Sequence, residues 1–114
     1  MNANEIENLP AGKKINQTIW WLIFDMSPTP LNNDINYLPD YSGDMNVAFS
    51  VVNKLEEHPN EILFSLTRKG STHEKLKWCA RFRECLGYQK EFYVEAETAP
   101  LAICRAALLA VMPR

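Results

Sequence analysis

The sequence predicts an α+β domain, in which a three-stranded antiparallel meander carries helices in the order α-α-β-β-β-α, an α/β sandwich. Two observations lead to this fold class. Apolar and polar or charged residues alternate strictly through 75–84 and again through 91–97, the period of half-buried strands. Three other segments repeat apolar residues at helical spacing. A chain of 114 residues builds one core, so we expect a single domain over 1–114.

The first helix is expected to begin near Pro10, because proline suits the first turn of a helix. Its apolar stripe should face the core and comprises Ile15, Ile19, Leu22, Ile23 and Met26. Trp20 and Trp21 widen this apolar arc beyond one contact surface, so we expect their rings to meet a second element or a partner.

A long Pro-rich loop at about 25–43 follows, and loops of this length are usually functional or mobile. Its acidic and aromatic mixture is typical of protein contact surfaces. The candidate partner-binding residues are Asp34, Tyr37, Asp40, Tyr41, Trp20 and Trp21. The alternative is an insertion that folds back over the two tryptophans.

The second helix is predicted with Ser42 as its N-cap and Asp44 in its first turn, where a negative charge favours the helix dipole. It should stop at the residue before Pro59. Its expected core stripe comprises Met45, Ala48, Phe49, Val52 and Leu55.

Strands are predicted at 61–67, 75–84 and 91–97, and the first is apolar enough on both faces to be central. Keeping inward residues together leaves two registers for the second hairpin. One sets Phe82 opposite Phe92, and the other is slipped by two residues. Both bring opposite charges together across the strands.

The third helix should start after Thr98, with Pro100 in its first turn. Its core face comprises Leu101, Cys104, Ala107, Leu108 and Val111. Its alanines allow close packing on the sheet, and Arg105 is expected at the solvent edge. The apolar segment is too short to cross a membrane.

The charge balance argues against a protein that mainly neutralises phosphates, because the net charge is −2 and the pI is near 5.7. Three cysteines without a C-x-x-C pair indicate neither a disulfide framework nor a zinc site. The N-terminus lacks the layout of a secretory signal. We therefore expect a protein of a reducing cytoplasm, without metal or cofactor.

No catalytic constellation emerges. His58 and His73 lie in expected loops, without a nucleophile at a recognisable spacing. Cys104 is expected to be a buried inert thiol. Lys77 and Arg81 flank Cys79 and would lower the pKa of its thiol, but facing glutamates oppose them. We therefore expect no enzyme, and a small enzyme built on Cys79 or a loop histidine is the least favoured reading.

A basic row on the sheet gives a further candidate site. Cationic and aromatic side chains on one sheet face are typical of surfaces that hold single-stranded nucleic acid or a nucleotide. The row comprises Lys77, Arg81, Arg83 and Tyr93, with Lys75 before them. The alternative, which the matching glutamates favour, is a solvated or helix-covered face with cross-strand ion pairs.

Three motifs resemble those of one protein family. "PDYSGDMNVAFSVVNKLEE" contains a Tyr-Ser-x-Asp helix entry, "EAETAPLAICRAALLAVM" a closing Ala-Pro-rich helix, and "LPAGKKINQTI" a Leu-x-Ala-Gly start. Together they resemble the phage ABA sandwich domain family. The resemblance implies an α/β sandwich encoded on a phage or prophage genome, and it does not imply an activity. The charged outer sheet face predicts only partial cover there, from the first helix.

We therefore expect a non-enzymatic phage or prophage accessory protein. It should act in the cytoplasm of a bacterial host and bind a host or phage macromolecule, with a host defence protein as the target to inhibit. Nucleotide or single-stranded nucleic-acid binding through the basic row is the alternative. No membrane partner is expected, and a homodimer stays open.

Overall fold

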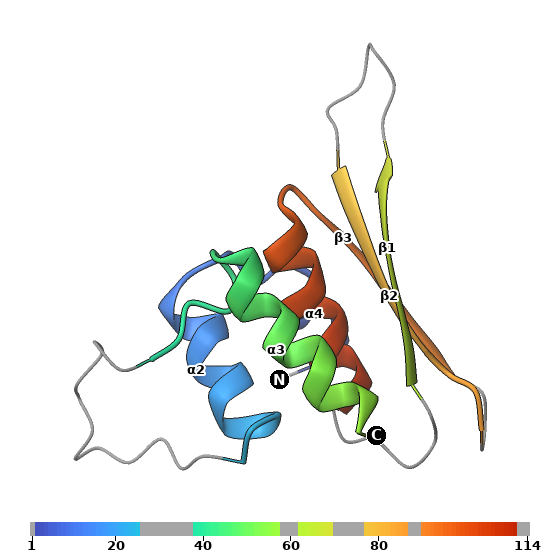
Figure 1. Ribbon diagram of the computed structural model, residues 1–114. Coiled ribbons are helices and arrows are strands. Elements are labelled where there is room, and N and C mark those ends of the chain that lie inside the picture. Colours follow the sequence, from blue (N-terminus) through green and yellow to red (C-terminus); the bar gives the residue numbers. More distant parts are fainter. Residues whose placement is uncertain (1, 26–37, 58–61, 70–76, 87–89, 112–114) are drawn as a thin grey trace.

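The computed structural model describes residues 2–25, 38–57, 62–69, 77–86 and 90–111 (Figure 1). Its elements are α1 (Ala3–Glu7), α2 (Lys13–Leu22), α3 (Met45–Glu56), β1 (Ile62–Lys69), β2 (Lys77–Glu84), β3 (Glu91–Ala96) and α4 (Ala99–Val111). The predicted α+β class, with one three-stranded antiparallel sheet, is confirmed. The short helix α1 is an addition, capped by the Asn2 side chain, which accepts a hydrogen bond from the Glu5 amide at 2.9 Å.

The sheet has the order β1-β2-β3, and Phe82 lies opposite Phe92, the first of the two predicted registers. β1 is an edge strand, so its predicted central position is wrong. Two consecutive hairpins place the first strand at one side of the sheet whatever its composition. β1 therefore keeps one edge without a strand partner among the described residues.

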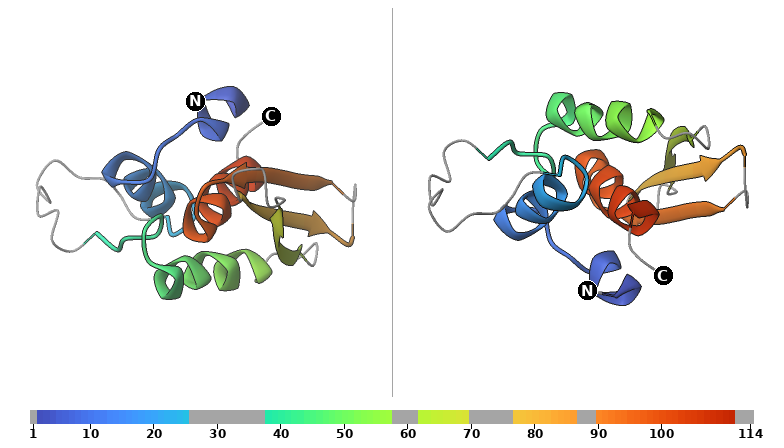
Figure 2. Two further views of the ribbon diagram at one scale, coloured as in Figure 1. Left: turned by 90° about the horizontal axis from the view of Figure 1, so that it is seen from above. Right: turned by 90° about the horizontal axis from the view of Figure 1, so that it is seen from below.

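All four described helices lie on one side of the sheet (Figure 2). α3 packs on β1, and α4 packs on β2 and β3, which confirms the prediction that these two helices cover the apolar face. The expected cover of the other face by the first long helix is wrong, because α2 packs against α4. The apolar residues Ile15 and Ile19 are fully buried on that side of α2.

Helix α4 is the centre of the molecule, with the sheet on one side and α1, α2 and α3 around the rest (Figure 2). A helix enclosed in this way is apolar around its whole circumference, not along one stripe. This position explains why the segment carries almost no charge. Its buried residues are Ala99, Leu101, Ala102, Ile103, Cys104, Ala106, Ala107, Leu108 and Leu109.

Two helix starts differ from prediction. α2 begins at Lys13, after Gly12 with φ of 139°, a value that favours glycine. Asp44, not Ser42, caps α3, because the Asp44 carboxylate accepts a hydrogen bond from the Asn46 amide at 2.9 Å. Ser42 is buried and serves another contact, described below.

The predicted core stripes are partly wrong. Leu22 and Phe49 are 40% and 43% exposed. Val51 takes the place of Phe49 in the core face of α3, while Met26 lies outside the described residues. Within the part of the chain that the structure describes, no helix is long and apolar enough to cross a membrane.

Candidate interaction surface

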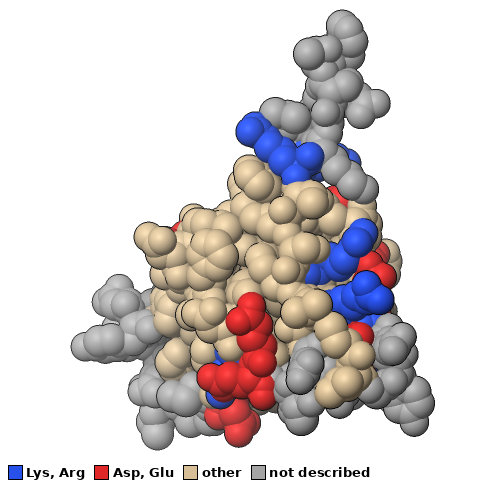
Figure 3. Space-filling view, turned by 45° about the vertical axis from the view of Figure 1, so that its right-hand side comes forward, with Lys and Arg blue, Asp and Glu red and all other residues tan. Residues whose placement is uncertain are grey.

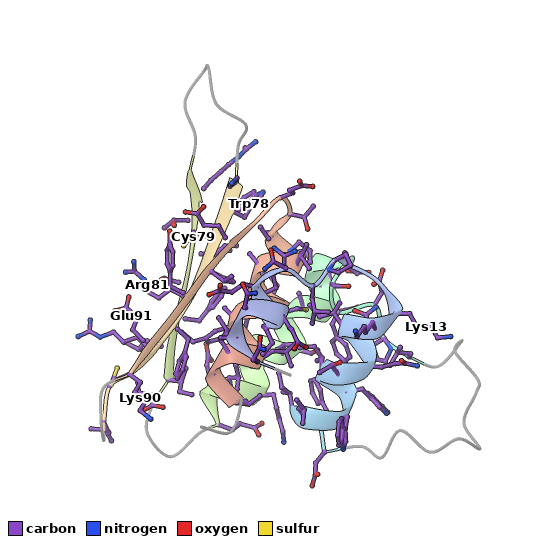
Figure 4. All side chains as sticks on the ribbon, turned by 180° about the vertical axis from the view of Figure 1, so that it is seen from behind. Lys13, Trp78, Cys79, Arg81, Lys90 and Glu91 are labelled. Carbon is purple, nitrogen blue, oxygen red and sulfur yellow. The ribbon has the colours of Figure 1, made fainter. Side chains whose placement is uncertain are left out.

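The sheet face that points away from the helices is a candidate interaction surface, and we call it the outer face. In Figure 4, Arg81 and Glu91 extend from it, away from the helical layer. None of the described helices packs on it in the views of Figure 2. Alternation along the strands assigns to it Leu63, Ser65, Thr67, Lys77, Cys79, Arg81, Arg83, Glu91, Tyr93 and Glu95.

The basic row of β2 is interleaved with acidic partners from β3. Arg81 Nε lies 2.7 Å from Glu91 Oε1, and both side chains are about half exposed. A solvent-exposed pair of this kind contributes at most about 1 kcal/mol to stability. The pair matters more for recognition of a ligand, because Glu91 already neutralises the Arg81 charge that an anionic ligand would contact. Figure 3, with the sheet side turned forward, shows blue and red side chains close to one another over this region.

Tyr93 is engaged through both its ring and its hydroxyl. The Arg81 guanidinium carbon lies 5.7 Å from the centroid of the Tyr93 ring, a cation–π arrangement. The Tyr93 hydroxyl donates a hydrogen bond to Glu95 Oε1 at 2.7 Å. A nucleic-acid base that stacked on this ring face would have to displace the guanidinium.

Cys79 belongs to the outer face but is only 2% exposed. Its cross-strand neighbours Thr67 and Glu95 stand on either side of it. A thiol covered to this extent offers no access to a substrate or an oxidant. The reading of Cys79 as a reactive residue therefore loses its structural basis.

Large apolar side chains also stand on the outer face. Leu63 is 61% exposed and lies opposite Arg83, while Tyr93 is 37% exposed. Leu86, which follows β2, is also exposed. Tyrosine and arginine are enriched in the centres of protein interfaces, and the exposed leucine adds apolar area beside them.

The second predicted surface lies at the far end of the molecule. Asp34 and Tyr37 fall outside the described residues. Trp21 is exposed on α2, whereas Trp20 is partly buried against the core. Of the predicted loop residues, Asp40 is exposed and Tyr41 is not.

Tyr41 is a core residue, which corrects its predicted place on a contact surface. Its ring is stacked on Phe24, with centroids 5.3 Å apart and planes 14° from parallel. Burial raises the pKa of its hydroxyl to about 12, with Cys104 as a second cause. The partner-binding role of Trp20, Trp21 and Asp40 stays a prediction.

A buried polar network joins the start of α2 to the turn before α3. Asn16 Oδ1 accepts hydrogen bonds from the Ser42 amide at 2.9 Å and from the Ser42 hydroxyl at 2.7 Å. Ser42 Oγ in turn accepts from the Gly12 amide at 2.9 Å, and Asn16 Nδ2 donates to Asp40 Oδ1 at 2.9 Å. The network shows why the segments "LPAGKKIN" and "PDYSGD" occur together, since their polar groups satisfy one another.

Sequence reasoning missed Asn16, which is 6% exposed. The sequence does contain a signal for it, because Asn16 follows the core residue Ile15 directly. An amide buried at such a position requires hydrogen-bond partners elsewhere in the chain. This signal does not identify the partners, since Ser42 lies 26 residues away in the sequence.

Arg105 is partly buried instead of lying at the solvent edge. Its Nε donates to the Leu9 carbonyl at 2.8 Å, and its Nη1 donates to the Glu95 carbonyl at 3.3 Å. Burial lowers the pKa of the guanidinium, while the charge of Glu97 opposes that change. Arg105 therefore ties α4 to the α1–α2 connection and to β3.

No group of three potential metal ligands among His, Cys, Asp and Glu occurs within the described ranges. His58 and His73 lie outside them. The absence of a metal, a cofactor and an enzymatic activity stays a prediction.

Comparison with known proteins gives one match. Residues 16–108 match the model of a family described as the phage ABA sandwich domain. The matched range contains most of α2, all of α3 and the sheet, and most of α4. No curated protein and no solved structure shows significant similarity to the chain.

Proposed function

Since this chain belongs to the phage ABA sandwich domain family, we propose that it is a non-enzymatic phage accessory protein that binds another protein through the outer face. One observation supports this proposal above the others. The outer face is free of helices in the described part of the chain, yet it exposes Leu63 and Tyr93. Burying exposed leucine and tyrosine side chains favours association.

The charge pattern of the outer face suits a protein partner better than a polyanion. Glu91 and Glu95 stand beside the cations of β2 and would repel phosphates. Arg81 already pairs with Glu91. Mixed charges around exposed apolar residues instead give a protein partner orientation and specificity.

The finer role that we propose is inhibition of a host defence protein. It rests on the phage-associated family and on the proposed binding function. Expressing the chain in a host that carries a defence system should restore plating of a phage sensitive to that system. Unrestored plating across a panel of defence systems would remove this role and leave the binding proposal standing.

Capture from host lysate tests the binding proposal. The double variant Leu63→Asp, Arg83→Glu places acidic charge at two exposed positions that face one another across β1 and β2. Trp21→Ser is the matched control, because it removes a comparable exposed apolar side chain from α2, far from the sheet. The proposal expects a protein that wild type and Trp21→Ser retain and the double variant loses. A partner lost only with Trp21→Ser would place the binding site on the loop side instead.

Nucleic-acid binding is the second candidate, supported by the exposure of Lys77, Arg81 and Arg83 along β2. It predicts a mobility shift of single-stranded oligonucleotides or a nucleotide at low salt, removed by Lys77→Glu with Arg81→Glu. Unchanged mobility at low salt would exclude it.

A further inference from the structure

The free edge of β1 is the second unpartnered feature of the sheet. β1 pairs with β2 over eight successive residues from Ile62 to Lys69, without a bulge. Its other edge has no strand partner in the described ranges, and the helices lie on one face only (Figure 2). Such an edge presents backbone amides and carbonyls that can pair with another strand.

β1 carries little of the protection that natural edge strands use. Edge strands are commonly guarded by proline, a bulge or charged side chains. The stretch from Ile62 to Thr67 contains none of these, and its cations stand at the end, at Arg68 and Lys69. The opposite edge, β3, is shorter and carries Glu91 and Glu95.

The side chains of β1 are also incompletely covered on both faces. Leu63 is 61% exposed on the outer face. Phe64 and Leu66, which face the helices, are only partly buried, although the Phe64 ring contacts that of Phe82 at 5.2 Å between centroids. A strand added beside β1 would cover these three side chains and satisfy the edge.

We propose that the occupant of this edge is β1 of a second copy, paired antiparallel, so that two sheets join into one of six strands. This pairing goes beyond the proposed binding function. Antiparallel pairing keeps the two cationic ends, Arg68 and Lys69 of each copy, at opposite ends of the interface. A parallel arrangement would place them side by side, where like charges repel.

The side-chain pattern selects the register. A two-fold axis perpendicular to the sheet keeps helix-side residues together, so the axis passes through a residue and not between two residues. Centred on Ser65, the pairing sets Phe64 opposite Leu66 of the second copy and Leu63 opposite its Thr67. Centred on Leu66, it would set Phe64 opposite Arg68 and Leu63 opposite Lys69. The first register pairs Phe64 with Leu66, sets only Ile62 opposite a cation, Arg68, and leaves Lys69 outside, whereas the second sets both Phe64 and Leu63 opposite cations.

Sedimentation velocity of the full chain over a concentration series tests the dimer. Ser65→Lys places two like charges opposite one another at the axis and should weaken dimerisation by about tenfold or more. Tyr93→Lys is the matched control, because Tyr93 stands on the same face and in the same row, at the other edge. Circular dichroism and thermal unfolding establish that each variant is folded.

The expected result is a dimer for wild type and Tyr93→Lys, and a folded monomer for Ser65→Lys. A Ser65→Cys variant with Cys85→Ser should also form a disulfide-linked dimer on oxidation, and Tyr93→Cys in the same background should not. A wild type that stays monomeric up to about 1 mM would overturn the proposal. So would a dimer that Ser65→Lys leaves intact. Failure of the dimer proposal can be distinguished from failure of the proposed partner binding. Arg83→Glu alone alters the outer face, which the partner-capture experiment tests, without changing the β1 edge that the dimer requires.

Discussion

Ser42 illustrates how much one buried hydroxyl contributes at the scale of a residue. It accepts from the Gly12 amide and donates to Asn16, so it links the starts of two helices. Ser42→Ala leaves the Gly12 amide without this acceptor, and we expect a loss of about 1–3 kcal/mol in the free energy of unfolding. Urea denaturation measures it.

Thr18→Ala is the control for this substitution. The Thr18 hydroxyl donates a hydrogen bond to the Lys14 carbonyl of its own helix at 2.8 Å, and its removal should change stability by less than about 0.5 kcal/mol. Equal losses for the two variants would contradict the role of the network.

The buried thiol of Cys104 predicts a specific alkaline response. Burial, with the charge of Asp40 as a second cause, raises its pKa from 9.0 to about 12. Below pH 9 both folded and unfolded chains keep this proton. Above pH 9 only the unfolded chain loses it, so its contribution to stability falls as the pH rises towards 12. Tyr41, with its pKa raised from 10.0 to about 12, adds a loss of the same sign.

Cys104→Ala isolates the part due to the thiol. We expect the decline in unfolding free energy between pH 9 and 11 to be shallower in this variant, by about 1 kcal/mol per pH unit. Parallel slopes for wild type and variant would show that Cys104 ionises equally in both states. The test compares the slopes and not the absolute free energies, because the substitution also leaves a small cavity that lowers stability at every pH.

At the scale of elements, the alanines of α4 set how closely this helix approaches its neighbours. Ala102 is fully buried, whereas Ala110, in the last turns, is partly exposed. Ala102→Leu should lower the unfolding free energy by about 1–3 kcal/mol or more through overpacking. Ala110→Leu should cost clearly less. Thermal denaturation of both variants compares them, and equal costs would mean that α4 does not pack closely around its circumference.

Arg105 connects three elements through backbone carbonyls. Arg105→Lys keeps the charge but cannot reproduce the two donors aimed at Leu9 and Glu95. We expect a loss of about 1–3 kcal/mol in chemical denaturation. Lys54→Ala, which removes an exposed 3.4 Å pair with Glu57, should cost under about 1 kcal/mol. A loss of stability for Arg105→Lys no larger than that for Lys54→Ala would contradict the proposal that the Arg105 hydrogen bonds hold α4 to the α1–α2 connection and to β3.

The elements themselves were largely predictable, because strict alternation identifies β2 and β3 and caps or prolines bound the helices. Helix starts were harder. Ser42 and Asp44 are both good N-caps, and only the tertiary position of Asn16 engages Ser42 elsewhere. The edge position of β1 follows from topology, and composition alone did not reveal it.

The candidate sites were less predictable for a related reason. The sequence placed Arg81, Arg83 and Tyr93 on one face, which the register confirms. It could not show that Arg81 pairs with Glu91 across a diagonal, or that Tyr41 enters the core. Both depend on contacts between segments whose relative positions are set by packing.

At the scale of the whole molecule, the helices and the apolar side of the sheet form one core with α4 at its centre. The outer face takes no part in that core within the described ranges, apart from the covered Cys79. Substitutions of its exposed side chains should therefore affect binding more than folding. This separation makes the binding proposal testable with folded variants.

The most direct measurement is the Kd of the captured partner protein for wild type and for the Leu63→Asp, Arg83→Glu double variant, by titration calorimetry. We expect the double variant, verified as folded by circular dichroism, to bind at least about tenfold more weakly, and Trp21→Ser to bind like wild type. An unchanged Kd for the folded double variant would contradict the assignment of the binding site to the outer face.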